Sequence, residues 1–292
     1  MHFYCIGAGA PTAVIEYGLG DISTNWSLVQ SRVAKVTRVC TYDRAGYAWS
    51  QPGPFPRTYD QLNLELHEGL RRLNENGPFV LVGHSFGGPV VRNYTQRYSN
   101  EVAGLVLVDT VHEDQRIVIG QKAVRLRASA RGRPIPPPRL KANASDLRAV
   151  AAVPSEGSVE PPFNQLSPEN QSHYLWAIAQ PALGAAEESQ RDWSGEYLNL
   201  MHEQSQTNLL KGRPLIVLTR AHGGYGDDLD VPATVLETER LKLQKQLTDL
   251  SSNSKQIMVD SDHNMHLSAP DVVAGAIEEV VQAVRKQRVL AK

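Results

Sequence analysis

Short apolar runs recur through the first 110 residues, and most of them stop at a Gly or an Asp. They cover residues 13–17, 37–42, 79–82 and 104–108. Continuous runs rich in β-branched residues and ended by turn residues are typical of strands buried on both faces of a parallel sheet. Between the second and third runs, leucines recur at helical spacing over residues 58–73. Strand and helix therefore alternate, which predicts an α/β fold.

The strand pattern stops near residue 111 and resumes a hundred residues later. Apolar runs at 214–218 and 255–259 predict two more strands. An apolar stripe that begins at about Pro270 predicts a final helix. The core of the fold is therefore expected in two parts, residues 1–110 and 212–292.

The hundred residues between these parts have a different character. Residues 111–148 hold nine Lys and Arg against three Asp and Glu, and they contain a proline-rich break at 134–138. Two amphipathic segments, 168–179 and 185–204, come after a second break. The whole insertion, residues 111–211, is expected to be a helical cap. Its basic segment is interpreted as a solvated face, with a docking surface for acidic substrates or anionic lipid as the alternative.

Residues 83–87 read Gly-His-Ser-Phe-Gly, which matches the pattern G-x-S-x-G. An apolar strand precedes the pattern and an amphipathic helix follows it, which is the context that a nucleophile elbow requires. The sharp turn forces Ser85 into a strained conformation that exposes its hydroxyl, and side chains at positions 83 and 87 would collide with neighbouring backbone. The amide of Phe86, at the start of the helix, would point at a developing oxyanion. Ser85 is therefore the predicted nucleophile.

Four blocks together carry a resemblance to a known family: residues 16–20, residues 42–46, the elbow, and Asp262-His263 ahead of Pro270. With them the chain resembles the α/β-hydrolase superfamily, and within it the capped bacterial serine hydrolases and esterases. The resemblance covers residues 3–115 and 212–285. It implies a mostly parallel central sheet flanked by helices, with an inserted helical cap.

The resemblance also implies an oxyanion hole. In the family, the residue after a His-Gly pair donates the second N–H, which corresponds here to Leu19 beside Phe86. Tyr17 stands where the His is usual, and since that His is mainly structural, the change is not counted against activity. The alternative is that residues 18–20 are a plain turn that ends a strand. Arg44, in the turn after the next strand, is expected to be structural.

A serine nucleophile needs a base that can accept its proton near neutral pH, and histidine suits this role. Of nine histidines, only His263 and His266 lie between the last strand and the last helix. The family's catalytic histidine lies about seven residues before a proline, which matches His263 and Pro270. His266 is the alternative, although it is expected to pack beneath the cap. Asp262 replaces the glycine that commonly precedes the catalytic histidine.

The acid that would orient the histidine has several candidates. Asp109 follows directly after the run 104–108, and a rigid strand end is a better support than a mobile loop. We therefore predict Asp109 as the third member of a catalytic triad. The alternatives are acids after the next strand or just beyond Asp109: Asp227, Asp228, Asp230 and Glu113.

Two cysteines, Cys5 and Cys40, are too few for a disulfide framework, and two buried thiols are expected. The alternative is a bridge, because the fold that the resemblance implies would place the strand of Cys5 beside that of Cys40; a bridge would favour an extracytoplasmic location. No leader is visible at the N-terminus, so the expected location is cytoplasmic unless a leader has been removed. No run reaches the ~18 to 20 apolar residues of a transmembrane helix.

Thirty basic against 31 acidic residues leave a net charge near zero, so no nucleic-acid partner is expected. No Cys/His cluster suggests a metal, and no cofactor is implied. The leading prediction is hydrolysis of a small-molecule carboxylic ester through an acyl-enzyme. Acyl transfer, or hydrolysis of an amide, lactone or C–C bond with the same triad, is the first alternative. A non-catalytic ligand-binding module on the same fold is the second. The sequence leaves the oligomeric state open.

Overall fold

In the computed structural model, which describes residues 1–143, 146 and 158–290, the described strands form one large sheet and one hairpin. The large sheet has seven strands in the order β1-β3-β2-β4-β5-β8-β9. Strand β1 is antiparallel to β3, and every other neighbouring pair is parallel. The strand bounds are β1 Phe3–Ile6, β2 Ala13–Glu16, β3 Val39–Tyr42, β4 Phe79–His84, β5 Val102–Val108, β8 Leu215–Arg220 and β9 Ser254–Val259. The predicted, mostly parallel sheet is confirmed.

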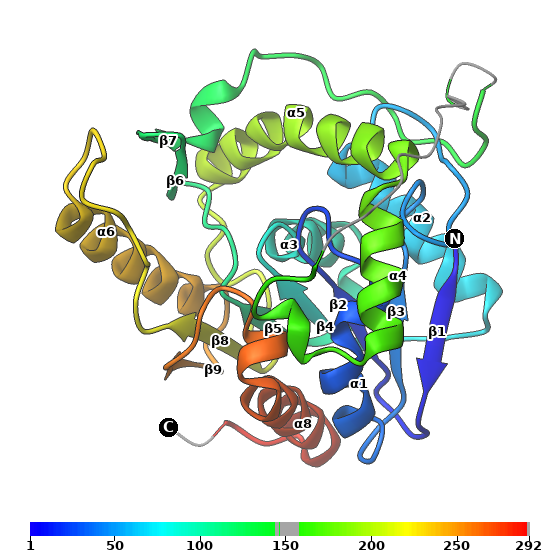
Figure 1. Cartoon of the computed structure of the whole chain (residues 1–292). Helices are drawn as coiled ribbons and strands as arrows, with labels where there is room; N and C mark the ends of the chain where they lie inside the picture. The colour runs from blue at the N-terminus through cyan, green and yellow to red at the C-terminus, as the bar shows by residue number, and fades with distance from the viewer. Residues whose placement is uncertain (144–145, 147–157, 291–292) are drawn as a thin grey trace.

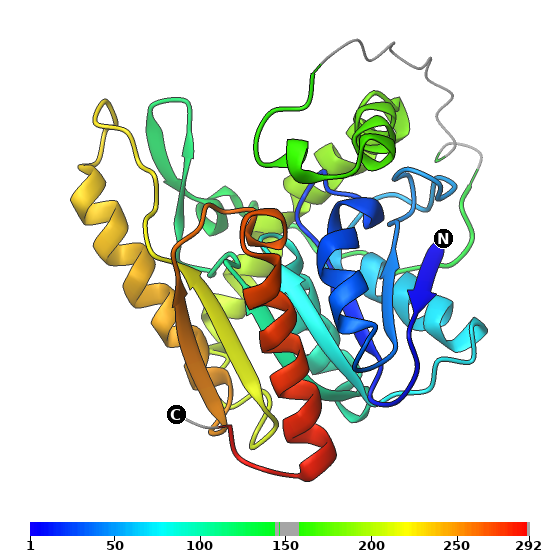
Figure 2. The ribbon, with the colours of Figure 1, turned by 60° about the horizontal axis from the view of Figure 1, so that its bottom comes forward.

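Helices cover both faces of this sheet (Figures 1 and 2). On one face α1 (Ser27–Val33) packs with α8 (Pro270–Lys286), and on the other α2 (Tyr59–Arg72) packs with α3 (Gly87–Arg97). A further helix, α6 (Ala233–Gln246), packs beside β8. Side chains of the central strands alternate between two buried clusters, so both faces must be apolar. This burial explains why the strands read as unbroken apolar runs.

The register brings the carboxyl ends of four strands to one edge of the sheet. His84 of β4 and Leu218 of β8 both pair with Val108 of β5, and Arg220 pairs with Val259 of β9. Residues that follow these strands in the sequence therefore meet at that edge, which is where open α/β sheets bind ligands.

The segment between β5 and β8 differs in part from its prediction. The predicted helices at 168–179 and 185–204 are present as α4 (Pro168–Ile178) and α5 (Pro181–Gln204), and they lie over the carboxyl edge of the sheet (Figure 1). Ahead of them, β6 (Arg116–Ile119) and β7 (Lys122–Arg125) form an antiparallel hairpin that the sequence analysis does not predict. The hairpin is short and rich in charge, so it lacks the apolar alternation that marks a half-buried strand.

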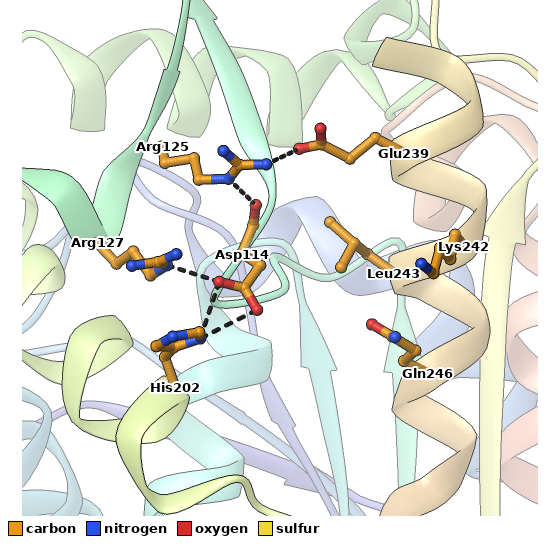
Figure 3. Close-up of a pocket in the computed structure, with 8 residues that line it drawn as sticks. All are labelled: Asp114, Arg125, Arg127, His202, Glu239, Lys242, Leu243 and Gln246. Atoms are coloured by element: carbon orange, nitrogen blue, oxygen red, sulfur yellow. Dashed lines mark hydrogen bonds and ion pairs between the residues drawn. The ribbon is translucent and has the colours of Figure 1, made fainter. Parts of the chain in front are cut away.

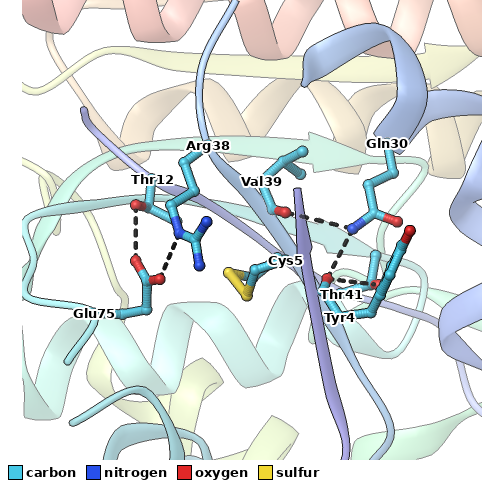
Figure 4. The surroundings of a disulfide bond; sticks show 9 residues. Tyr4, Cys5, Thr12, Gln30, Arg38, Val39, Thr41 and Glu75 are labelled. Carbon is cyan, nitrogen blue, oxygen red and sulfur yellow. Dashed lines mark hydrogen bonds and ion pairs between the residues drawn. A yellow bond between two sulfur atoms is a disulfide. The ribbon is translucent and has the colours of Figure 1, made fainter. Parts of the chain in front are cut away.

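The two cysteines are joined, so the prediction of two free buried thiols is wrong. Cys5 on β1 lies directly opposite Cys40 on β3, with 4.1 Å between their Cα atoms, and the two form a disulfide. Figure 4 shows the bridge beside an ion pair between Arg38 Nε and Glu75 Oε1 at 2.5 Å. The pairing depends on the register of an antiparallel edge strand, which composition cannot reveal. No described helix is long and apolar enough to cross a membrane.

Candidate active site

Ser85 lies in the tight turn that joins β4 to α3, and its φ of +50° is a left-handed value that L side chains rarely adopt. Glycine is needed around it because the backbone is crowded. A Cβ on Gly87 would lie 2.2 Å from the carbonyl oxygen of Glu16, and a Cβ on Gly83 would lie 2.8 Å from the Cα of Gly88. The turn therefore has the strained geometry that the glycine pattern predicts, and the Ser85 side chain remains partly accessible.

His263 Nε2 lies 2.9 Å from Ser85 Oγ, and the His263 side chain is 38% exposed. The loop that carries His263 follows β9 and leads into the short helix α7 (Met265–Ser268). The backbone of His263 has a partner as well: His84 Nε2 donates to the carbonyl oxygen of His263 at 2.9 Å. Because a carbonyl can only accept, the His84 proton must be on Nε2. Burial, with the nearby His263 and His266, holds the pKa of His84 well below its usual range, so His84 is neutral.

Asp109 Oδ2 lies 2.6 Å from His263 Nδ1, on the side of the ring away from Ser85. The carboxylate follows β5, and the backbone N–H of Asp109 donates to the Leu218 carbonyl of β8 at 2.8 Å. Burial tends to raise the pKa of Asp109, but the hydrogen bond and charge of His263, with Arg220 and Arg240, outweigh it and lower that pKa. Asp109 is therefore a carboxylate at neutral pH.

The alternative acids have other partners. Asp228 Oδ2 accepts from Gln121 Nε2 at 3.2 Å, and Asp230 Oδ1 accepts from the Ala123 amide at 2.8 Å, so both hold the β6–β7 hairpin. Asp227 is exposed in the same loop.

Glu113 is paired with Arg92 at 2.7 Å. Burial opposes the ionisation of Glu113, but the Arg92 charge outweighs it and lowers the pKa of Glu113 to about 2. The structure thus brings together Ser85, His263 and Asp109 rather than any of the alternatives.

His266, the alternative base, is fully buried and stacks on Trp26 with 4.5 Å between ring centroids. Burial, with the nearby His263, lowers the pKa of His266 to about 3. Its nearest carboxylate is Asp21, at 3.7 Å, and no hydrogen bond connects it to Ser85 among the described residues. His266 is therefore a neutral packing residue, and it packs on α1's side of the sheet with Trp26.

The predicted oxyanion loop passes directly beside the nucleophile. A Cβ on Gly18 would lie 3.5 Å from the Ser85 Cβ, so the backbone here approaches Ser85 closely. Arg44 holds this loop from beneath: its guanidinium donates to the carbonyl oxygen of Gly18 at 3.0 Å and to that of Tyr17. Arg44 is itself buried and paired with Glu16, whose Oε1 accepts from Arg44 Nε at 2.6 Å. The assignment of the Leu19 and Phe86 amides as oxyanion donors stays a prediction.

The sequence analysis did not identify two arginines near the site. Arg220 Nε lies 3.4 Å from Asp109 Oδ2, and Arg240 NH1 lies 3.7 Å from Asp109 Oδ1. The sequence signal for Arg220 is that it lies two residues after the apolar run 214–218, near the end of a predicted strand.

Three buried side chains could be considered as metal ligands: Asp21, His84 and His266, whose ligand atoms lie within 4.8 Å of one another. Ligand atoms on one zinc ion lie roughly 3.3 Å apart. Both oxygens of Asp21 already accept hydrogen bonds, from Asn25 Nδ2 and Trp26 Nε1 among others. This arrangement does not fit a metal centre.

A separate cavity of about 490 Å³ lies between β7, α5 and α6 (Figure 3). Three of its basic side chains contact acidic partners: Asp114 contacts Arg127 at 2.6 Å and His202 at 3.0 Å, and Arg125 contacts Glu239 at 3.1 Å. The charges of the basic segment are therefore largely balanced here, which agrees with a solvated, ion-paired face.

Comparison with solved structures places the fold. A probable hydrolytic enzyme from Pseudomonas aeruginosa PAO1 superposes with a TM-score of 0.64 and 19% identity, covering 96% of this chain and 89% of that one. A thermophilic esterase from Thermogutta terrifontis superposes with a TM-score of 0.61 and 18% identity, covering 97% and 93%. At these identities the likeness shows the shared fold alone.

Sequence comparison gives the family. An AB hydrolase superfamily protein from Gibberella zeae is 22% identical over 306 residues, covering 94% of this chain and 87% of that protein. Two other curated relatives match only about a third of this chain. The matched segment covers 16% of the length of one relative and 41% of the length of the other. The model of the alpha/beta hydrolase family matches residues 7–276. Because the family model matches nearly the whole chain and the fold agrees with it, this protein belongs to the alpha/beta hydrolase family.

Proposed function

We propose that this protein is a serine hydrolase that cleaves carboxylic esters through an acyl-enzyme. One observation carries the proposal: an unbroken chain of contacts from Ser85 Oγ to His263 Nε2 at 2.9 Å, and from His263 Nδ1 to Asp109 Oδ2 at 2.6 Å. A nucleophile, a base and an orienting carboxylate in this order is the arrangement that acyl transfer requires.

In the proposed reaction, Ser85 Oγ attacks the acyl carbon while its proton passes to His263 Nε2. The negative charge that develops on the carbonyl oxygen is held by the amides of Leu19 and Phe86. Asp109 keeps the Nδ1 proton of His263 in place and stabilises the imidazolium. The C–O bond to the alcohol then breaks, and the alcohol leaves with the proton from His263. Water, deprotonated by His263, attacks the acyl-enzyme and releases the acid and free Ser85.

Apolar side chains surround the proposed oxyanion donors. Phe86 belongs to a buried cluster that includes residues of α5, and Leu19 and Val111 pack against it. We propose that residues 111–211 form a cap over this edge and that the acyl group lies against these apolar side chains. A small, uncharged acyl chain is the matching substrate class.

The test is turnover of chromogenic esters of increasing acyl length by the wild-type chain and by Ser85→Ala. We expect Ser85→Ala to lose on the order of 10⁴-fold or more in turnover, as removal of a triad member does elsewhere. Ser31→Ala, which changes an exposed serine on α1, is the matched control and should keep full activity. A fluorophosphonate probe should label Ser85 and no other serine. Normal turnover by Ser85→Ala, or labelling elsewhere, would refute the proposal.

We also propose an extracytoplasmic location, supported by the disulfide between Cys5 and Cys40. Disulfides persist mainly in oxidising compartments. Thiol alkylation of the protein directly after lysis of its native host should find both cysteines blocked; two free thiols would place the chain in a reducing compartment instead.

A further inference from the structure

Two guanidinium groups flank the carboxylate of Asp109. Arg220 extends from the end of β8, with its Nε 3.4 Å from Asp109 Oδ2, and its backbone N–H lies 3.4 Å from Asp109 Oδ1. Arg240 reaches from α6 and places NH1 3.7 Å from Asp109 Oδ1. The oxygen that faces His263 at 2.6 Å is the same Oδ2 that faces Arg220. Asp109 is therefore shared between the imidazole and two cations.

The two cations are balanced differently. Arg240 is 1% exposed and pairs with Glu237 on its own helix at 2.6 Å, while its NH1 has no hydrogen-bond partner. For Arg220, the carboxylate within ion-pair distance in the described part of the chain is that of Asp109. The buried Nε of Arg220 likewise has no hydrogen-bond partner. Asp109 thus serves as the counter-charge for Arg220 as well as for a protonated His263.

We propose that Arg220, supported by Arg240, is a positioning residue that fixes the Asp109 carboxylate. Its charge also limits how strongly Asp109 stabilises protonated His263, and as a result activity extends to lower pH. Its relevance to turnover rests on the proposed function. A triad with an isolated carboxylate goes from a net charge of −1 to 0 when the histidine takes the proton. Here the group of Asp109, Glu237 and the two arginines has a net charge near zero beforehand, so the imidazolium forms beside a group that carries no net negative charge.

Other ionisable groups lie near Asp109 and His263, and the variants proposed below leave them unchanged. They are, by element, His84 at the end of β4, His266 on α7, Asp21 after β2, Tyr225 after β8, and Asp262 beside His263 itself. The two histidines are neutral because burial lowers the pKa of each. Burial raises the pKa of Asp21, and it also raises the pKa of Tyr225, which is neutral at ordinary pH. Asp262 is exposed, and its carboxylate binds the Asn264 amide and the Ser268 hydroxyl.

The size of the effect follows from distance. The contacts from Arg220 Nε to Asp109 Oδ2 and from there to His263 Nδ1 place the two nitrogens no more than about 6 Å apart, the sum of the two distances. Two like charges at this separation, with an effective dielectric constant of roughly 20 to 40, interact strongly enough to move a titration midpoint by about one to two pH units. Removing the Arg220 charge should therefore raise the midpoint of the acid limb in the pH profile of kcat/KM by about that amount.

The experiment compares Arg220→Gln with three further variants. Arg220→Lys keeps a charge and should restore most of the wild-type profile. Glu237→Gln leaves Arg240 without its partner and should move the midpoint the opposite way, to lower pH, which keeps the test open if Arg220→Gln fails to fold. Arg125→Gln removes an arginine that pairs with Glu239 on α6 and is the matched control, with no expected shift.

A second readout does not depend on turnover. The midpoint at which the His263 ring resonance titrates, followed by NMR and assigned with a His263→Gln variant, should shift in the same directions. If the variants shift this titration but no ester is hydrolysed, the proposal for Arg220 stands and the proposed function fails. If Arg220→Gln lowers kcat at every pH without moving either midpoint, Arg220 has a merely structural role and the proposal is overturned.

Discussion

Replacing Arg44 with Met removes the charge that balances a buried carboxylate next to residues 17–20, the loop predicted to hold the oxyanion. Glu16 and Arg44 are each 1% exposed, and Arg44 also donates to the Tyr17 and Gly18 carbonyls. In the variant, Glu16 must either stay ionised in a dry site or take up a proton, and burial already raises its pKa. Removing one partner of a buried ion pair costs about 3–5 kcal/mol, because the other charge is left uncompensated.

This loss should be measured as the free energy of unfolding in urea at pH 8, where a free carboxylate is ionised. Glu16→Gln with Arg44→Met gives a double-mutant cycle. Because the double variant leaves no unpaired carboxylate, it should be more stable than the sum of the single losses predicts, by about 2 kcal/mol or more. Arg191→Met is the matched control: it breaks an exposed pair with Glu187 on α5 and should cost less than about 1 kcal/mol.

A loss below about 1 kcal/mol for Arg44→Met, or strictly additive losses in the cycle, would show that the pair does not stabilise the fold. Turnover adds a second readout. Since Arg44 fixes the carbonyls beside Ser85, the folded variant should lose kcat more than it raises KM.

Three further outcomes are expected. The pKa of His266 is lowered to about 3 in the folded state against about 6.5 unfolded, so the chain should lose stability as pH falls from 6.5 towards 3. Between pH 7.5 and 4.5 the loss is about 3 kcal/mol, and urea unfolding of His266→Phe should show a loss smaller by that amount. Replacing Cys5 and Cys40 by Ala opens a loop with a sequence separation of 35 and should cost about 3–4 kcal/mol in the same assay, whereas an unchanged midpoint would contradict a constraining bridge. Asp109→Asn should cut kcat by about 10⁴-fold and, because Asp109 is also the counter-charge of Arg220, should lower the melting temperature; a loss of kcat below tenfold would leave Asp109 with a structural role only.

Much of the fold follows from local pattern. The leucines of residues 58–73 predict α2, and the apolar runs predict the core strands, because the period of apolar positions is fixed within a few residues of chain. The elbow is also local: Gly83 and Gly87 are required by backbone that crowds the turn itself. The short, charged β6–β7 hairpin gives no such pattern and is not predicted. The helices α1 and α6 are not predicted either.

Contacts between residues far apart in the sequence cannot be predicted from local pattern. The sequence by itself determined the parallel core, the elbow at Ser85 and the loop that carries His263, since each is encoded by neighbouring residues. It left Asp109 among several acids, because the contact with His263 joins residues 154 positions apart. Only the tertiary structure decided that contact, the pairing of Cys5 with Cys40, and the approach of Arg220 to Asp109. All three depend on strand register and order, and these are settled when both faces of the sheet are buried at once.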